Sequence, residues 1–180
     1  MLVTEWTLAE VRRAVGDLAA AEALLLRIVP ALERDLGAEH PDVAQVILGL
    51  GKLHRARRDF AAARREDLRA LTISEKLLGP RHPQVAHCLV ELAGLDIADA
   101  RAADALPLLT RALAIYSEYE GDQTGELDAH LELTRALIAT GGDRARARRE
   151  AEAARAGQSA IGSTPRVAEL DAWLAAHTSL

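Results

Sequence analysis

The sequence predicts an all-α protein built as a stack of antiparallel helix pairs, with about nine helices and no strands. The first reason is an internal repeat: the segment LGAEHPDVA from Leu36 to Ala44 returns as LGPRHPQVA from Leu78 to Ala86, 42 positions later. The second is composition, with 49% hydrophobic but only 3% aromatic residues, 12 glycines and 6 prolines. Alanine and leucine, which together make up roughly a third of the chain, are strong helix formers, and small alanine lets helices pack closely. Together with the modest glycine and proline content, this disfavours a β-sandwich or a glycine-rich nucleotide-binding fold.

Each repeat has the pattern of two helices. In the second repeat, Pro41 begins a helix over 41–56, at a first-turn position where its missing N–H costs nothing. Apolar residues then recur at helical spacing, and Asp59 marks a polar turn. A second helix over 60–78 ends at Gly79-Pro80, which is a helix stop signal.

The same reading extends along the chain. We expect a single domain over 1–180, with repeats at about 1–36, 37–78, 79–120 and 121–162. A last helix at about 165–177, with Thr164 as its N-cap, would close the C-terminal end of the stack. The other expected helices cover 4–15, 18–36, 83–98, 102–119, 125–140 and 144–157.

The repeat resembles the tetratricopeptide repeat (TPR) of the kinesin light chain type, which has 42 residues and is also widespread in bacterial signalling proteins. The motif Leu-Gly-Pro-x-His-Pro-x-Val-Ala at the repeat junction carries the resemblance, which covers about residues 4–157. It implies a right-handed α-solenoid. Asp67 departs from the family pattern, and so do Thr134 and Arg135, so we expect the fourth repeat to pack less tightly or to rotate.

The resemblance also implies a function. The family holds a peptide or a partner helix on its concave face, which is lined by the first helix of each repeat. The protein is then expected to be a non-catalytic interaction scaffold, with a groove that is apolar in the middle and of mixed charge at its edges. The matching positions are Trp6 in the first repeat, Gln45, Leu48, Lys52 and Arg55 in the second, His87, Val90, Glu91 and Ile97 in the third, and Glu132 and Leu133 in the fourth.

Charge and cysteine content exclude several other functions. A net charge of −5 opposes general binding to nucleic acid or to anionic membranes. No apolar run reaches the length of a membrane span, and no signal peptide is visible, so a cytoplasmic location is expected. Cys88 is the single cysteine, which excludes an internal disulfide and a cysteine-rich metal site. We expect no cofactor and no metal.

Catalytic and metal-binding interpretations compete with structural ones at several residues. His40 and His82 occupy equivalent junction positions, where capping or turn packing is favoured. Cys88 is interpreted as a small buried hydrophobe, because a nucleophile needs a positioned base. His54 and His87 could approach one another across the groove, and Glu126 lies four residues before His130; packing or simple pairing is favoured for each.

A second functional hypothesis rests on charged edges. Arginines cluster around the turns at 55–65 and 144–149, and an acidic stretch runs from Glu118 to Glu132. These edges could dock a folded signalling partner, which would make the protein an adaptor or regulatory subunit. A terminal repeat with an exposed apolar end could also support a homodimer.

Overall fold

The computed structural model describes residues 2–119, 123–160, 171–172 and 174–175. Within this part of the chain there are eight α-helices and no strands, which confirms the all-α prediction. Most of the expected capping helix lies outside the described residues. The helices are α1 (Leu2–Ala14), α2 (Leu18–Leu36), α3 (Pro41–Ala56), α4 (Phe60–Leu78), α5 (Pro83–Ala98), α6 (Ala102–Tyr116), α7 (Gln123–Ala139) and α8 (Arg144–Ala160).

The helix boundaries follow local capping chemistry. The side chains of Asp17 and Asp59 accept hydrogen bonds from the backbone N–H groups at the starts of α2 and α4. His40 caps α3 and His82 caps α5 in the same way, which confirms their structural role. Arg101 occupies the equivalent position before α6 and makes no side-chain cap.

Several boundaries differ from the sequence prediction: α1 begins at Leu2, α7 begins at Gln123 and α8 ends at Ala160, each two or three residues beyond the expected bound. The helix α6 ends at Tyr116, three residues before the expected end at 119. The Ser117 hydroxyl donates to the Ala114 carbonyl there, and the following amides make tight turns back to Ile115 and Tyr116. A local side-chain bond of this kind competes with the continuation of a helix.

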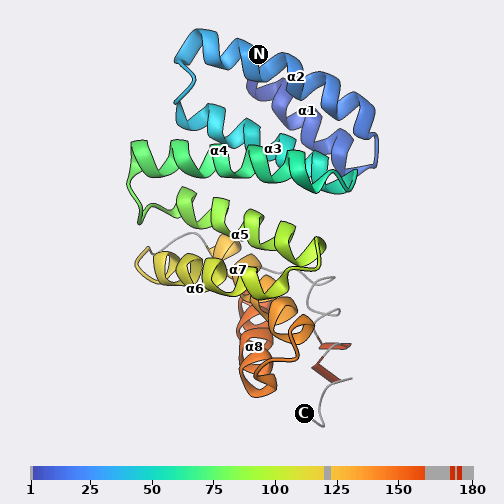
Figure 1. The fold of residues 1–180 in the computed structure, drawn as a ribbon, viewed down its shortest axis with the longest axis vertical. Helices are drawn as coiled ribbons and strands as arrows, with labels where there is room; N and C mark the ends of the chain where they lie inside the picture. The colour runs from blue at the N-terminus through green and yellow to red at the C-terminus, as the bar shows by residue number, and fades with distance from the viewer. Residues whose placement is uncertain (1, 120–122, 161–170, 173, 176–180) are drawn as a thin grey trace.

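The helices form four antiparallel pairs, which we call units one (α1, α2), two (α3, α4), three (α5, α6) and four (α7, α8) (Figure 1). The backbones of consecutive first helices approach each other, whereas in the described part of the chain the backbones of the second helices come close only to those of first helices. The first helices α1, α3, α5 and α7 therefore form the inner, concave side.

The core is continuous through the stack. One apolar cluster covers units one and two, another covers units three and four, and Leu71 packs against both. Unit four is turned relative to the others: α8 runs along the long axis in Figure 1, whereas α4 and α5 cross it.

Candidate binding groove

Five charged or titratable side chains meet on the concave side, and we call them the groove cluster. Lys52 and Arg55 come from α3, His87 and Glu91 from α5, and Glu132 from α7. The spacing from Lys52 to Arg55 and from His87 to Glu91 places each pair on one face of its helix. Three consecutive first helices thus contribute to one polar surface.

Glu91 is the common partner within the groove cluster. Its carboxylate lies 3.0 Å from Lys52 Nζ, 3.2 Å from Arg55 Nη2 and 3.5 Å from His87 Nε2. Only 13% of the Glu91 side chain is exposed. The cluster therefore ties α3 to α5 while the outer ends of Lys52 and His87 remain accessible.

Arg55 crosses α5 over a glycine. Its Nη1 donates to the Glu91 carbonyl at 3.3 Å, and a Cβ on Gly94 would lie only 2.7 Å from the same nitrogen. The Glu132 carboxyl carbon would lie 3.9 Å from the same Cβ. A larger residue at position 94 would displace the guanidinium, so Gly94 is a positioning residue, a role that the sequence pattern does not indicate.

The electrostatics of the two carboxylates differ. Burial pushes the pKa of Glu91 upward, but the His87 hydrogen bond and the charges of Lys52 and Arg55 outweigh it and hold the pKa at about 2. Burial raises the pKa of Glu132, and the nearby Arg135 and Arg55 offset this only in part. The groove cluster therefore holds one firmly ionised carboxylate and one that is less well compensated.

A recess of about 170 Å³ adjoins the groove cluster between α5 and α7. It combines apolar surface from Val90 and Tyr116 with polar groups from both helices. Such a combination suits an apolar anchor residue of a peptide flanked by polar backbone. The lining residues are His87, Val90, Glu91, Tyr116, Thr124, Gly125 and Asp128.

Three of the expected groove residues are core residues in this structure. Leu48 is 1% exposed, Val90 6% and Leu133 0%. Leu48 and Leu133 pack inside the stack, and Val90 shows only a small surface to the recess. The middle of the concave side is accordingly charged, which corrects the expectation of a small, apolar centre.

The remaining expected residues are spread along the concave side. The Gln45 Nε2 donates to Gln84 Oε1 at 2.5 Å, and Ile97 packs against the apolar cluster of units three and four. Trp6 packs against the core of units one and two, and its buried indole Nε1 lies 3.8 Å from where a Cβ on Gly49 would be. These three residues lie outside the groove cluster.

The other candidate side chains have structural partners. Cys88 is fully buried, and burial raises the pKa of its thiol to about 12, which confirms its interpretation as a small hydrophobe. His87 contacts Glu91, and no contact joins it to His54 in the described part of the chain. His130 Nδ1 lies 2.7 Å from Glu150, so its partner is on α8 and is not Glu126.

Many arginines of the outer edges are paired between units. Arg57 pairs with Glu22, Arg69 with Glu33, and Arg111 with Glu75. On α8, Arg146 pairs with Glu150 and Arg148 with Glu152. Within the described residues, no three His, Cys, Asp or Glu side chains gather as a metal site would require.

Stacked helix pairs with their first helices on the concave side define an α-solenoid, a class whose curved inner surface commonly binds other chains. The sequence matches the tetratricopeptide repeat family over residues 1–67 and 55–118. The chain therefore belongs to the tetratricopeptide repeat family, as its junction motif suggests. No curated protein matches the sequence significantly.

Solved structures share the fold. BtubC (BKLC) from P. vanneervenii has a TM-score of 0.75 at 22% identity, and the match covers 89% of this chain and 64% of that one. A putative kinesin light chain with nearly identical TPR-like repeats from Podosopora anserina has a TM-score of 0.64 at 26% identity, covering 89% and 76%. A variant of that protein gives 0.67 at 27% identity with the same coverage. This chain thus spans about two thirds of the length of BtubC.

Proposed function

We propose that the protein is a non-catalytic scaffold that binds a peptide or helix of a partner protein along its concave side. The observation that carries this proposal is the groove cluster, in which three helices present partly exposed charges beside an apolar recess. The recess between α5 and α7 would receive an apolar anchor, and Lys52 and His87 would contact the polar part of the ligand.

The proposal concerns a protein partner and not nucleic acid or a membrane. It is supported by the net charge of −5. In the part of the chain that the structure describes, no helix is long and apolar enough to cross a membrane. We further propose a cytoplasmic location. We also propose a role in bacterial signalling, for which the junction motif is the support.

Docking through the charged edges has less support. Two of the arginines that would form such a surface already pair with carboxylates of neighbouring units, Arg57 with Glu22 and Arg64 with Asp96. A folded partner would have to compete with these pairs. The concave side therefore remains the preferred binding surface.

A display library of random peptides tests the proposal. Peptides selected on the wild-type protein are measured by fluorescence anisotropy against the variant Lys52→Ser with His87→Ser. Each of the two side chains is at least one fifth exposed, and Arg55 still neutralises Glu91, so the fold should persist. We expect binding to weaken by roughly tenfold or more.

The matched control is Arg34→Ser with Arg65→Ser, which removes two cations that are more than two thirds exposed. Circular dichroism verifies the helical content of all three proteins. Peptides that lose affinity equally for both variants would indicate a general charge effect. Peptides that bind the groove variant at full affinity would move the site away from the concave side.

A homodimer through unit one is a second part of the proposal. Leu8, Val11 and Val15 are exposed on α1 and in the turn after it. The other end of the described stack, α8, carries the ion pairs of Arg148 and Arg155 on its surface. An apolar face meets its own copy better than a charged end, which favours a closed twofold dimer.

A further inference from the structure

The two junctions that lead into α3 and α5 have the same backbone conformation. Gly37 has φ 93° and ψ 148°, and Gly79 has φ 88° and ψ 159°. The following histidines, His40 and His82, are both extended and cap their helices through Nδ1. Both loops lie on the same edge of the stack in Figure 1. The second junction is therefore an internal reference for the first.

At each junction, an ion pair joins the loop to the C-terminal end of the second helix in the unit that the loop leads into. The acidic partner is on the loop at the first junction and the basic partner is on the loop at the second. At the first junction, Lys76 Nζ lies 2.6 Å from Glu39 Oε1. At the second junction, Glu118 pairs with Arg81. Residues 39 and 81, and residues 76 and 118, are each one repeat apart. The side chains at the two junctions therefore also correspond.

The junctions differ in the residue that follows this ion pair. At the second junction, the ring of Tyr119 packs against the ring of His82, with centroids 6.4 Å apart. The pKa of Arg81 is raised, first by its hydrogen bond to Glu118 and by that carboxylate's charge, and further by Tyr119. The phenol ring thus lies beside the imidazole. At the first junction the residue one repeat earlier is Leu77, which has no ring and lies within α4, whereas Tyr119 follows the end of α6.

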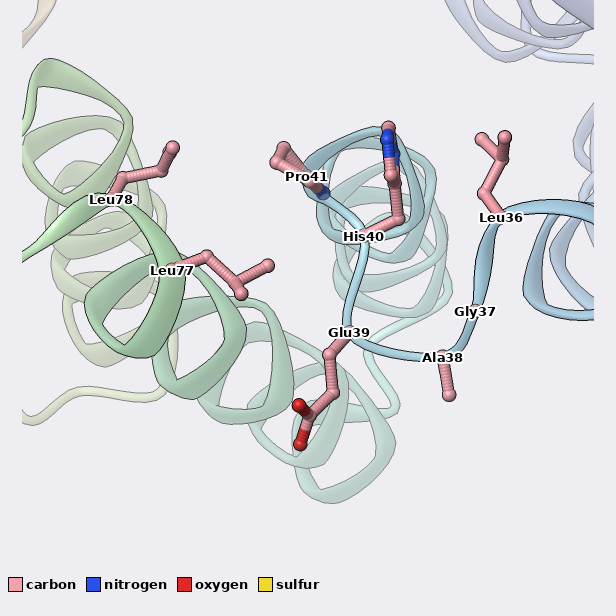
Figure 2. Close-up of a pocket in the computed structure, with 8 residues that line it drawn as sticks. All are labelled: Leu36, Gly37, Ala38, Glu39, His40, Pro41, Leu77 and Leu78. Carbon is pink, nitrogen blue, oxygen red and sulfur yellow. The ribbon is translucent and has the colours of Figure 1, made fainter.

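A recess of about 510 Å³ lies at the first junction. Figure 2 shows Leu77 and Leu78, from the last turn of α4, on one side of it and the loop through His40 on the other. Leu36 and Leu77 are each nearly half exposed. The recess is large enough for an aromatic side chain together with its flanking backbone.

We propose that this recess binds a tyrosine side chain of a partner protein, whose ring would pack against His40 as Tyr119 packs against His82 at the second junction. The ring would pack on His40 and on the two leucines. At the polar end of the site, Glu39 stands where the second junction has Arg81. Its carboxylate accepts hydrogen bonds, so the site suits a ligand group that donates one. A carboxylate held by Lys76 still has lone pairs free to accept a phenol hydroxyl, and this favours tyrosine over phenylalanine.

This surface is separate from the proposed groove. It is formed by the α2–α3 loop and the end of α4, at the edge of the stack, whereas the groove cluster lies on α3, α5 and α7. The protein would then hold two segments at once, or one partner at two places. The inference does not depend on the groove proposal.

The test uses three short probes, acetyl-Ala-Tyr-Ala-amide and its Phe and Leu analogues, titrated into the full chain. Leucine methyl and histidine ring signals are followed by nuclear magnetic resonance. We expect saturable shifts at Leu36, Leu77 and His40 with the tyrosine probe, and binding of the phenylalanine probe weaker by about threefold to tenfold. The leucine probe should give no saturable shift. Glu39→Gln should reduce the preference for tyrosine.

Two reciprocal variants provide the control. Leu77→Tyr should fill the recess from within the chain and abolish probe binding. Tyr119→Leu should open the second junction and produce new shifts at His82. Both residues are nearly half exposed, so thermal unfolding should stay close to wild type.

The proposal is overturned if the tyrosine probe binds Leu77→Tyr as well as wild type, or if shifts are spread over the whole surface. It is also overturned if the protein alone shows concentration-dependent shifts at Leu36 and Leu77, because a second copy would then occupy the recess. The groove variant with Lys52→Ser and His87→Ser should bind the probe normally. Failure at the junction is therefore distinguishable from failure of the groove.

Discussion

Asp67 on α4 places a buried carboxylate against Gly51 of α3. A Cβ on Gly51 would lie 1.9 Å from Asp67 Oδ1, and this oxygen has no hydrogen-bond partner among the described residues. The neighbouring units have alanine and leucine at these two positions, which pack without a polar atom. Unit two therefore carries a cost that its neighbours avoid. The equivalent pairs are Ala9 with Leu25 in unit one and Ala93 with Leu109 in unit three.

Ionisation of Asp67 should make the stability of the protein depend on pH. Burial, followed by the charge of Glu91, raises the pKa of Asp67 from 3.8 to about 7, although Arg55 and Lys52 oppose the shift. Because the folded-state pKa is the higher one, the folded state binds more protons between about pH 4 and 7. Stability should therefore fall as pH rises through this window, by roughly 4 kcal/mol at most. Urea unfolding at pH 5, 6, 7 and 8 measures this slope.

Asp67→Asn should make the slope clearly shallower, because the amide does not titrate; Glu132, whose pKa is also raised by burial, supplies the slope that remains. The double variant Gly51→Ala with Asp67→Leu gives unit two the pair found in its neighbours. Its stability should show the same shallow pH dependence as Asp67→Asn and should exceed that of wild type at pH 8. Glu91 does not contribute to the slope in this pH range. Because its pKa is lowered, the stability that it contributes is lost only as pH falls from about 4.5 toward 2. Parallel pH profiles of wild type and Asp67→Asn would contradict the assignment.

The groove residues show how far sequence reasoning extends at the residue scale. The resemblance placed Lys52, Arg55, His87 and Glu91 on first helices, and the structure brings these four together. It could not give the depth of Leu48, because a small rotation of a helix decides whether a residue faces the core or the groove. The path of Arg55 over Gly94 depends on the spacing of three helices, which no local pattern contains.

The turn within each of the first three helix pairs contains a residue in the left-handed region. In unit one this residue is Gly16, with φ 85°. In units two and three it is Arg58, with φ 63°, and Ala100, with φ 59°. A non-glycine residue in this conformation costs about 1 kcal/mol. The turns of units two and three are therefore strained relative to that of unit one.

Ala100→Gly should relieve this strain and stabilise the protein by about 0.5 kcal/mol, because the greater freedom of glycine in the unfolded chain offsets part of the gain. Gly16→Ala is the converse change. It should destabilise by about 0.5 kcal/mol, because the backbone strain of about 1 kcal/mol is partly offset by the smaller freedom of alanine in the unfolded chain, and no clash adds to it since nothing lies within 4 Å of the added Cβ. Thermal unfolding of both variants measures the effect. Arg58 is less suitable because its guanidinium stacks over Phe60.

Helices were the most predictable elements. The junction motif contains a glycine stop and a proline start, so the bounds of α3, α4 and α5 agree with the sequence prediction. The expected end of α6 was wrong because the third junction lacks that motif, and a serine side chain decides the boundary. Local signals fix helix ends only where the capping residues are present. The division into four repeats within one domain stays a prediction.

At the scale of the whole molecule, the stack should self-associate through unit one. Leu8 and Val11 are 44% and 53% exposed, whereas their equivalents in unit two, Leu50 and Leu53, are 6% and 0% exposed and belong to the apolar cluster that joins units one and two. The face of α1 thus retains the residues of an inter-repeat interface, and an apolar face of this kind favours association.

Sedimentation velocity over a range of concentrations should show a monomer–dimer equilibrium. Leu8→Gln with Val11→Gln should keep the chain monomeric, whereas Leu26→Gln with Leu68→Gln, which changes two similarly exposed leucines on second helices, should leave the equilibrium unchanged. A wild-type chain that stays monomeric throughout, or a dimer weakened equally by both variants, would show that another surface governs association.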